Sequence, residues 1–389
     1  MPKRSRLVAV GVAVAIVAAG GAYGIYRATG AGKRAVTSPT SSSSAPVTGP
    51  GGGTGPGNTM PASAGMKPAI TGLIDPFGYP PASLVSSRTV SAFVVMANWR
   101  DLQPLAGGPL VHPNAIDQAI EEARAAGGGL AVKIRFFAGV HSPVWALNLD
   151  GSPVDFPATA AAPGGAVPRF WTPRFEQAYT DIQAKLAAAY DSVPEVREVT
   201  ISECMTIFAE PFIRQAEQAA NREALLAAGY TDSANQACLR NSIDTHRQVW
   251  RHTRSSLAFN PYQEIDADGS WHNNPSTTDS LMNYCRQRLG SACVLENNSV
   301  RAPISKLGTA YGLMYARMRQ LGPPITLQTA TPSRIGCLLT SECPAGVVGV
   351  LDWSVSLGAT ALELPADLDR YAVSFLQPYN GQLTANLRV

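Results

Sequence analysis

The sequence predicts an α/β protein whose main domain, residues 67–389, is a (β/α)8 TIM barrel. Short apolar runs of five to ten residues alternate there with amphipathic segments. Regular alternation of this kind implies a parallel sheet covered by helices. No glycine-rich phosphate-binding loop is placed between such a run and a helix, which favours a closed barrel over a doubly wound sheet. The length of this part of the chain is also normal for a barrel.

Eight apolar runs supply the strands. Seven read clearly as strands, and a run near Ile70–Ile74 completes the set. The other seven are Val90–Trp99, Leu130–Gly139, Val196–Cys204, Ser256–Asn260, Cys293–Asn297, Ile325–Thr329 and Thr360–Leu364.

Helices are expected between the strands. Residues Ala115–Ala126 place four apolar side chains on one helical face. Thr172 is expected as an N-cap because Pro173 suits the first helical position. Further helices are expected within Ala216–Trp250, Thr309–Leu321 and Ala345–Leu357.

Residues 1–36 read as a targeting segment. Three basic residues, Lys3, Arg4 and Arg6, precede the uncharged run Leu7–Tyr26. Twenty apolar residues in a helix span about 30 Å, the thickness of a bilayer core. This favours an uncleaved signal anchor, with a cleaved signal peptide as the alternative. In either case we expect the barrel outside the cytoplasm, on the cell membrane or secreted.

Residues 37–66 are expected to be a flexible linker. Of these 30 residues, 23 are Gly, Pro, Ser or Thr and none is charged. Such a segment buries too little surface to offset the entropy lost on ordering.

Charge and cysteine content argue against a nucleic-acid-binding protein and a metal site, and in favour of disulfide bonds. The formal net charge is +3, which argues against a nucleic-acid partner. The six cysteines form no Cys-x-x-Cys pair, and no His-x-x-x-His occurs, so neither a metal site nor a cofactor is expected. An even number in an exported chain suggests disulfides. We expect Cys285–Cys293, Cys337–Cys343 and Cys204–Cys238, one of fifteen possible pairings.

The strand ends carry the polar residues expected to do chemistry, because active residues of a barrel lie at the C-terminal ends of its strands. These ends hold four glutamates, three amides, one arginine and two tryptophans. They are Glu203, Glu210, Glu296, Glu363, Asn98, Asn260, Gln328, Arg135, Trp99 and Trp145. Carboxylates and amides bind sugar hydroxyls, and tryptophan stacks on sugar rings. Glycoside hydrolysis requires two carboxyl groups.

Several motifs resemble those of retaining TIM-barrel glycoside hydrolases. They are WRDLQP (Trp99–Pro104), Ile116-Asp117, the KIRFFAG strand and SPVW (Ser142–Trp145). The resemblance implies an acid/base at Glu210, where Ala209-Glu210-Pro211 stands for the family's Asn-Glu-Pro. The family's nucleophile would fall on the strand that carries Gln328, so Glu363 on the next strand is the expected nucleophile or base.

The predicted function is therefore a glycoside hydrolase, or a transglycosylase, acting on an extracellular or cell-envelope polysaccharide. Glu210 and Glu363 are the expected catalytic pair, with Glu203 and Glu296 as alternatives. Asn98, Asn260 and Gln328 would bind sugar hydroxyls. Ala209 and Gln328 motivate the alternative of a non-catalytic carbohydrate-binding barrel.

Each candidate also has a structural interpretation. Strand alternation places Glu203 toward the helices rather than the barrel interior. Glu363 lies between two leucines, where a buried carboxylate requires a partner, and Arg135 is the expected inward partner of one of the glutamates. Trp99 and Trp145 are as consistent with packing at the rim as with sugar stacking.

Overall fold

The computed structural model describes residues 65–388, apart from 128, 159–162, 214, 302–308, 332–334, 336–342 and 367–369. The expected signal anchor and all but the last two residues of the expected linker lie outside these residues. Within the part of the chain that is described, no helix is both long and apolar enough to cross a membrane.

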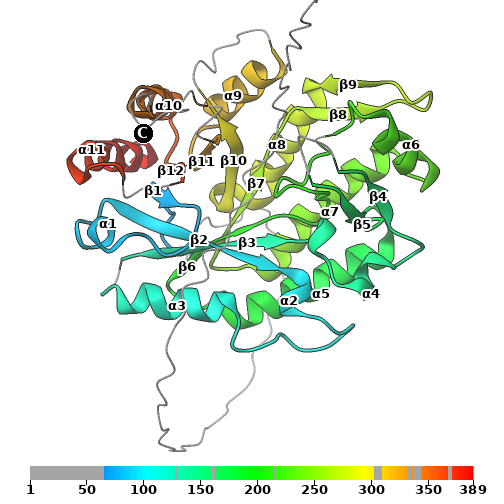
Figure 1. The fold of residues 1–389 in the computed structure, drawn as a ribbon, viewed down its shortest axis with the longest axis horizontal. Coiled ribbons are helices and arrows are strands. Elements are labelled where there is room, and N and C mark those ends of the chain that lie inside the picture. Colours follow the sequence, from blue (N-terminus) through cyan, green and yellow to red (C-terminus); the bar gives the residue numbers. More distant parts are fainter. Residues whose placement is uncertain are drawn as a thin grey trace, which may run out of the picture.

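A closed barrel of eight parallel strands forms the centre of the molecule (Figure 1). Its strands follow the order β1-β12-β11-β10-β7-β6-β3-β2, so each strand pairs with the neighbours that a (β/α)8 barrel requires. Their bounds are Gly72–Asp75 (β1), Val90–Asn98 (β2), Ala131–Phe137 (β3), Val196–Thr200 (β6), Arg254–Ala258 (β7), Cys293–Val300 (β10), Ile325–Thr329 (β11) and Ala361–Glu363 (β12). All eight expected strands are confirmed.

Helices surround the barrel, as Figure 1 shows. The longer ones are Ala115–Ala125 (α3), Pro173–Tyr190 (α5), Ala219–Ala227 (α6), Asp232–Val249 (α7), Pro275–Leu289 (α8), Ala310–Leu321 (α9), Cys343–Leu357 (α10) and Val373–Ala385 (α11). Three short helices, Ala82–Ser86 (α1), Trp99–Leu102 (α2) and Val144–Leu147 (α4), lie in the first three β/α units. The expected helices are confirmed, and Pro173 is the first residue of α5, although Thr172 forms no capping hydrogen bond through its side chain.

Two antiparallel hairpins interrupt the alternation and were not anticipated. Strand β4 (Val154–Phe156) pairs with β5 (Gly165–Val167), and β8 (Tyr262–Ile265) pairs with β9 (Trp271–Asn274). The turn of the second hairpin is the Asp266–Gly269 run, in which Gly269 adopts φ 83°.

Two apolar layers stabilise the barrel. The outer one lies between strands and helices and contains most of the buried side chains. The inner one is small and lies inside the barrel, formed by Ile70, Ile74, Ala92, Val94, Ala131 and Ala361. The small volume of these inner residues leaves room inside the barrel for longer polar side chains.

Disulfides tie helices to strands at two places. Cys204, just after β6, is bonded to Cys238 on α7, and Cys285 on α8 is bonded to Cys293 at the start of β10. Both expected pairings are confirmed. The third, Cys337–Cys343, falls outside the described residues and side chains.

Candidate functional site

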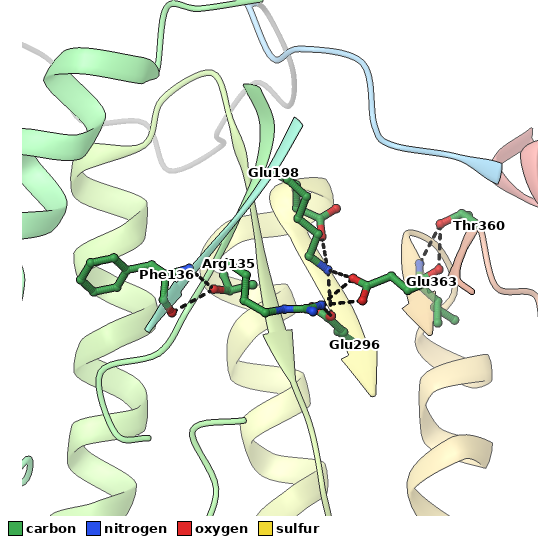
Figure 2. A network of polar contacts seen from close by, with 9 residues as sticks. Arg135, Phe136, Glu198, Glu296, Thr360 and Glu363 are labelled. Atoms are coloured by element: carbon green, nitrogen blue, oxygen red, sulfur yellow. Dashed lines mark hydrogen bonds and ion pairs between the residues drawn. The ribbon is translucent and has the colours of Figure 1, made fainter. Parts of the chain in front are cut away.

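A cluster of buried charged side chains from several barrel strands is held together by hydrogen bonds and ion pairs (Figure 2). Lys133 and Arg135 are two residues apart on β3, so both point into the barrel. They meet Glu198 from β6, Glu296 from β10 and Glu363 from β12. All five side chains are at most 3% exposed. A buried charge is costly unless it is paired, and here every charge has an opposite partner.

Glu363 is the most tightly held member of this cluster. Nη2 of Arg135 donates to both of its carboxylate oxygens at 2.6 Å, and Nζ of Lys133 donates to Oε1 at 2.9 Å. Figure 2 shows the arginine reaching across the barrel to this carboxylate. The expectation that Arg135 is the inward partner of a glutamate is confirmed.

Glu296 and Glu198 contact the same two cations less completely. Oε1 of Glu296 accepts from Lys133 at 2.8 Å and from Arg135 at 3.3 Å, while its Oε2 has no partner among the described residues. Nζ of Lys133 lies 2.9 Å from Oε1 of Glu198.

The pKa values of Glu363 and Glu198 shift in opposite directions. Burial alone would raise the pKa of Glu363, but the charges of Arg135 and Lys133 outweigh it and hold its pKa below the ordinary value. Burial raises the pKa of Glu198, Lys133 lowers it, and the negative charge of Glu296 adds to the rise, so the net shift is upward. A proton held on Glu198 would leave Lys133 and Arg135 facing two carboxylates, those of Glu296 and Glu363.

Glu210 lies above this cluster, in the loop that follows β6, and its side chain is half-buried. Burial lowers the pKa of Arg135, but the negative charges of Glu363, Glu296 and Glu210 together raise it above the ordinary value. Glu210 is therefore close enough to Arg135 to act on its charge. The structure thus brings three of the sequence-predicted residues, Glu210, Arg135 and Glu363, into one electrostatic group.

Amide side chains from neighbouring strands lie at the same end of the barrel. Gln328 on β11 is directly opposite Glu363 in the strand register and is 8% exposed, and no hydrogen bond joins its side-chain amide to another described residue. Asn260, two residues after β7, accepts from the Tyr311 hydroxyl at 3.0 Å, and its Nδ2 has no partner among the residues described. Nε of Arg135 is unpartnered in the same sense. Buried polar atoms normally have a partner, so these atoms mark places where water or a polar ligand binds.

Glu203 lies elsewhere, between the barrel and its helices. Its carboxylate is fully buried and accepts from Nδ2 of Asn241 on α7 at 3.2 Å. Burial, and then the charge of Glu176 on α5, raise the pKa of Glu203 well above its ordinary value. The alternation argument that placed Glu203 toward the helices is confirmed, and the side chain is not part of the group around Arg135.

Trp99 packs in the core, and its full burial leaves no ring face for a sugar, whereas Trp145 stays partly exposed. Trp99 is fully buried and packs against the rings of Phe175 and Tyr179 on α5. Trp145 is half-buried, lies edge-on to Trp99 with ring centroids 5.6 Å apart, and donates to the Gln103 carbonyl. The stacking role of Trp145 on a sugar ring therefore stays a prediction.

Asn98 ends β2 and precedes α2. Its Nδ2 donates to Oδ2 of Asp101 at 2.8 Å, so this amide has a partner three residues along the chain. Close by, Nη2 of Arg100 lies 2.9 Å from Nδ1 of His141. Burial and then the charge of Arg100 lower the pKa of His141 to about 4.

Sequence reasoning missed two carboxylates of this region, Glu198 and Asp75. Glu198 was missed because its strand reads Val-Arg-Glu-Val-Thr. The adjacent charged residues Arg197 and Glu198 lie on opposite faces, so alternation alone did not show which face points into the barrel. Asp75 was missed because the first strand was expected to end at Ile74, whereas β1 includes one more residue.

Within the described residues, no group of three or more His, Cys, Asp or Glu side chains could hold a metal ion.

Comparisons with known proteins returned structural matches alone. No protein-family model and no curated protein matched the sequence. Among solved structures, a triple mutant of an endo-β-1,4-glucanase from Xanthomonas axonopodis pv. citri is similar, with 13% identity, coverage of 82% of this chain and 95% of that one, and a TM-score of 0.48. A second endo-β-1,4-glucanase from the same organism has 14% identity over 79% of this chain and 91% of that one, with a TM-score of 0.48. Endo-glycoceramidase II from Rhodococcus sp. has 15% identity over 76% and 72% of the two chains, with a TM-score of 0.46. In its closed parallel barrel, the chain resembles these TIM-barrel glycoside hydrolases.

Proposed function

We propose that this barrel is a glycoside hydrolase, or a transglycosylase, that acts on an extracellular or cell-envelope polysaccharide. The observation that carries the proposal is the gathering of carboxylates and unpartnered amide groups at one end of the barrel, around Arg135. Carboxylates and amides are the groups that bind sugar hydroxyls, and two carboxyl groups can carry out hydrolysis.

Glu210 is the proposed general acid/base, because it lies in the loop after β6 and is half-exposed. Glu363 is the proposed nucleophile or base, since Arg135 and Lys133 keep it ionised. In this mechanism Glu210 donates a proton to the glycosidic oxygen as the bond to the anomeric carbon breaks, and the second carboxylate attacks that carbon or activates water. Glu296 is the alternative second carboxylate, and Asn260 and Gln328 would hold the sugar hydroxyls.

A specific observation also favours a second function, a barrel that binds polysaccharide without cleaving it. Both oxygens of Glu363 already accept hydrogen bonds, and the side chain is fully buried. Gln328 stands on the strand where the resemblance implies a nucleophile, and a neutral amide cannot attack the anomeric carbon.

Activity and binding assays on a panel of neutral and acidic polysaccharides separate the two functions. The variants are Glu210→Gln, Glu363→Gln and Glu296→Gln, with Glu121→Gln on the exposed face of α3 as the matched control. Hydrolysis requires that wild type and the control release reducing ends while Glu210→Gln loses at least a hundredfold in rate. Binding without release by the wild type would support the second function, and full activity of both Glu210→Gln and Glu363→Gln would overturn the proposed site.

We also propose that the barrel lies outside the cytoplasm, either tethered by residues 1–36 or secreted. Two disulfides support this, because they persist in oxidising compartments. Protease treatment of intact cells tests it, and a barrel that is protected from protease and recovered with cytoplasmic proteins would contradict it.

A further inference from the structure

The loop that follows β1 combines a carboxylate with two exposed aromatic side chains. Asp75 is the last residue of β1, and residues 76–81 lead into α1. Because the strands are parallel, this loop belongs to the C-terminal end of the barrel, where barrels hold their ligands. No role has so far been assigned to any residue of this loop.

Asp75 is a mostly buried carboxylate that has no cation beside it. It is 6% exposed, and its Oδ1 accepts a hydrogen bond from the backbone N–H of Phe77 at 2.8 Å. Within the described part of the chain Asp75 forms no ion pair, and the one hydrogen bond to its side chain is made to Oδ1. Asp75 therefore differs from Glu363, whose two oxygens are both bound by Arg135, in keeping one oxygen available to accept.

The neighbours of Asp75 supply one negative charge and no positive one. Strand β12 lies beside β1 with Glu363 opposite Ile74, one residue before Asp75. The other elements around β1 are β2, α1 and α11, whose sequences contain no Asp, Glu, Lys, Arg or His within their bounds. The one titratable group in those three elements, Tyr379, donates to Asp352. Burial raises the pKa of Asp75, the hydrogen bond from the Phe77 amide lowers it, and the charge of Glu363 raises it. Together these effects bring the pKa of Asp75 to about 6.

Phe77 and Tyr79 expose aromatic surface beside this carboxylate. Their exposed fractions are 42% and 41%, whereas the Trp99 ring is fully buried. The Tyr79 ring packs edge-to-face against Phe93 of β2 with centroids 5.7 Å apart, which holds it in place. An exposed ring held in this way is suited to stack on the apolar face of a sugar.

We propose that Asp75, Phe77 and Tyr79 form a subsite that binds one neutral pyranose ring of a polysaccharide. The inference rests on the proposed carbohydrate function and specifies its substrate class. The C–H face of the sugar packs on the exposed aromatic rings, and Oδ2 of Asp75 accepts a hydrogen bond from a sugar hydroxyl. The segment 72–81 contains no Lys, Arg or His, so it offers no counter-ion to a uronic acid. A carboxylate without a cation repels an anionic sugar, which makes a neutral one the occupant.

Binding at this subsite strengthens as pH rises. The ionised carboxylate accepts hydrogen bonds at either oxygen and binds a hydroxyl more strongly than the protonated acid does. Because the pKa of Asp75 is about 6, the carboxylate form dominates above that pH. Affinity for a neutral glycan should therefore increase between pH 5 and pH 7.5.

Calorimetric titration of the whole protein with soluble β-glucan, xylan, mannan and polygalacturonate tests the subsite. We expect Asp75→Asn to weaken binding of the neutral glycan about tenfold at pH 7.5 and to flatten its pH dependence. Phe77→Ala, at an exposed position, should weaken binding at least threefold and keep the pH dependence. Glu121→Gln on α3 is the control and should match wild type.

The possible results separate the subsite from the proposed function. If wild type binds a neutral glycan and both Asp75→Asn and Phe77→Ala bind it equally well, the subsite is wrong and the proposed function stands. Preferential binding of polygalacturonate would overturn the neutral-sugar assignment. A wild type that binds none of the four polysaccharides would overturn both the proposed function and the subsite.

Discussion

Replacing Glu363 with glutamine should destabilise the fold far more than the same replacement of Glu198. Both carboxyl groups are fully buried, and both lie 2.9 Å from Nζ of Lys133. Their pKa values shift in opposite directions, because Arg135 and Lys133 lower that of Glu363 while burial raises that of Glu198. Glutamine is nearly isosteric with a protonated glutamate but lacks the charge of an ionised one. The pair therefore forms a matched comparison.

The magnitude follows from what each substitution leaves behind. Glu363→Gln removes a negative charge from between Arg135 and Lys133 and leaves one net positive charge in a site that is at most 3% exposed. Removing one partner of a buried ion pair costs about 3–5 kcal/mol. If the upward shift keeps Glu198 protonated at pH 7, Glu198→Gln replaces a neutral group and should cost less than about 1 kcal/mol.

The double variant sharpens this test. In Glu363→Gln, the excess positive charge favours loss of the proton from Glu198, which restores the balance of charge and recovers part of the lost stability. Glu198→Gln/Glu363→Gln cannot recover in this way, so its loss should exceed the sum of the single losses. For the same reason the deficit of Glu363→Gln alone should shrink as pH rises from 4.5, the ordinary pKa of a glutamate, through the raised pKa of Glu198.

Guanidinium denaturation at pH 7 and 25 °C, with the disulfides oxidised, measures these losses through tryptophan fluorescence. The free energies of unfolding of wild type, both single variants and the double variant form a double-mutant cycle. Equal losses for the two single variants, or strict additivity in the double variant, would refute the assignment of the proton to Glu198.

Two further predictions concern stability. Because burial raises the pKa of Glu203, the native state favours its protonated form, and the stability it contributes is lost as pH rises from its ordinary value of 4.5 through the raised one. The free energy of unfolding of Glu203→Gln should therefore rise relative to that of wild type by up to about 1.4 kcal/mol per pH unit in that range. Urea denaturation at several pH values measures this difference, and a difference that does not change with pH would contradict the prediction. Removing Cys204–Cys238, with a sequence separation of 34, should cost about 4 kcal/mol, and removing Cys285–Cys293, with a separation of 8, about 2.5 kcal/mol. Double alanine variants compared by thermal denaturation test this order, and the reverse order would show that loop entropy does not decide it.

The strands were predictable because each is a short run of apolar residues whose burial needs no knowledge of its neighbours. Val90–Asn98 and Ile325–Thr329 are examples, and the structure places each at or within one residue of its expected ends. Strand ends set by tertiary contacts were less predictable. The run Val196–Cys204 stops pairing at Thr200, because the chain then turns, with the Met205 amide donating to the Ser202 carbonyl.

The site was predictable where alternation alone decides the direction of a side chain. Arg135 was expected to point inward and Glu203 to point away from the barrel interior, and the structure agrees with both. The burial of Trp99 was not predictable, because the Phe175 ring that encloses it comes from α5, distant in the sequence. The role of Asp75 depends in the same way on a distant residue, since Glu363 is brought beside β1 only when the barrel closes.

Closure of the barrel also bears on which carboxylate would attack a sugar. A nucleophile needs one oxygen free to approach the anomeric carbon, yet both oxygens of Glu363 accept from Nη2 of Arg135 at 2.6 Å. Glu296 is held by the same cations through Oε1 alone, and its Oε2 has no partner among the described residues. If the alternative carboxylate Glu296, rather than Glu363, attacks the sugar, Glu296→Gly, and not Glu363→Gly, should recover turnover when azide is supplied as a small external nucleophile. Rates expressed per folded molecule remove the effect of each substitution on stability. Recovery in Glu363→Gly alone would show that Arg135 releases this carboxylate when substrate binds, and would return the nucleophile to β12.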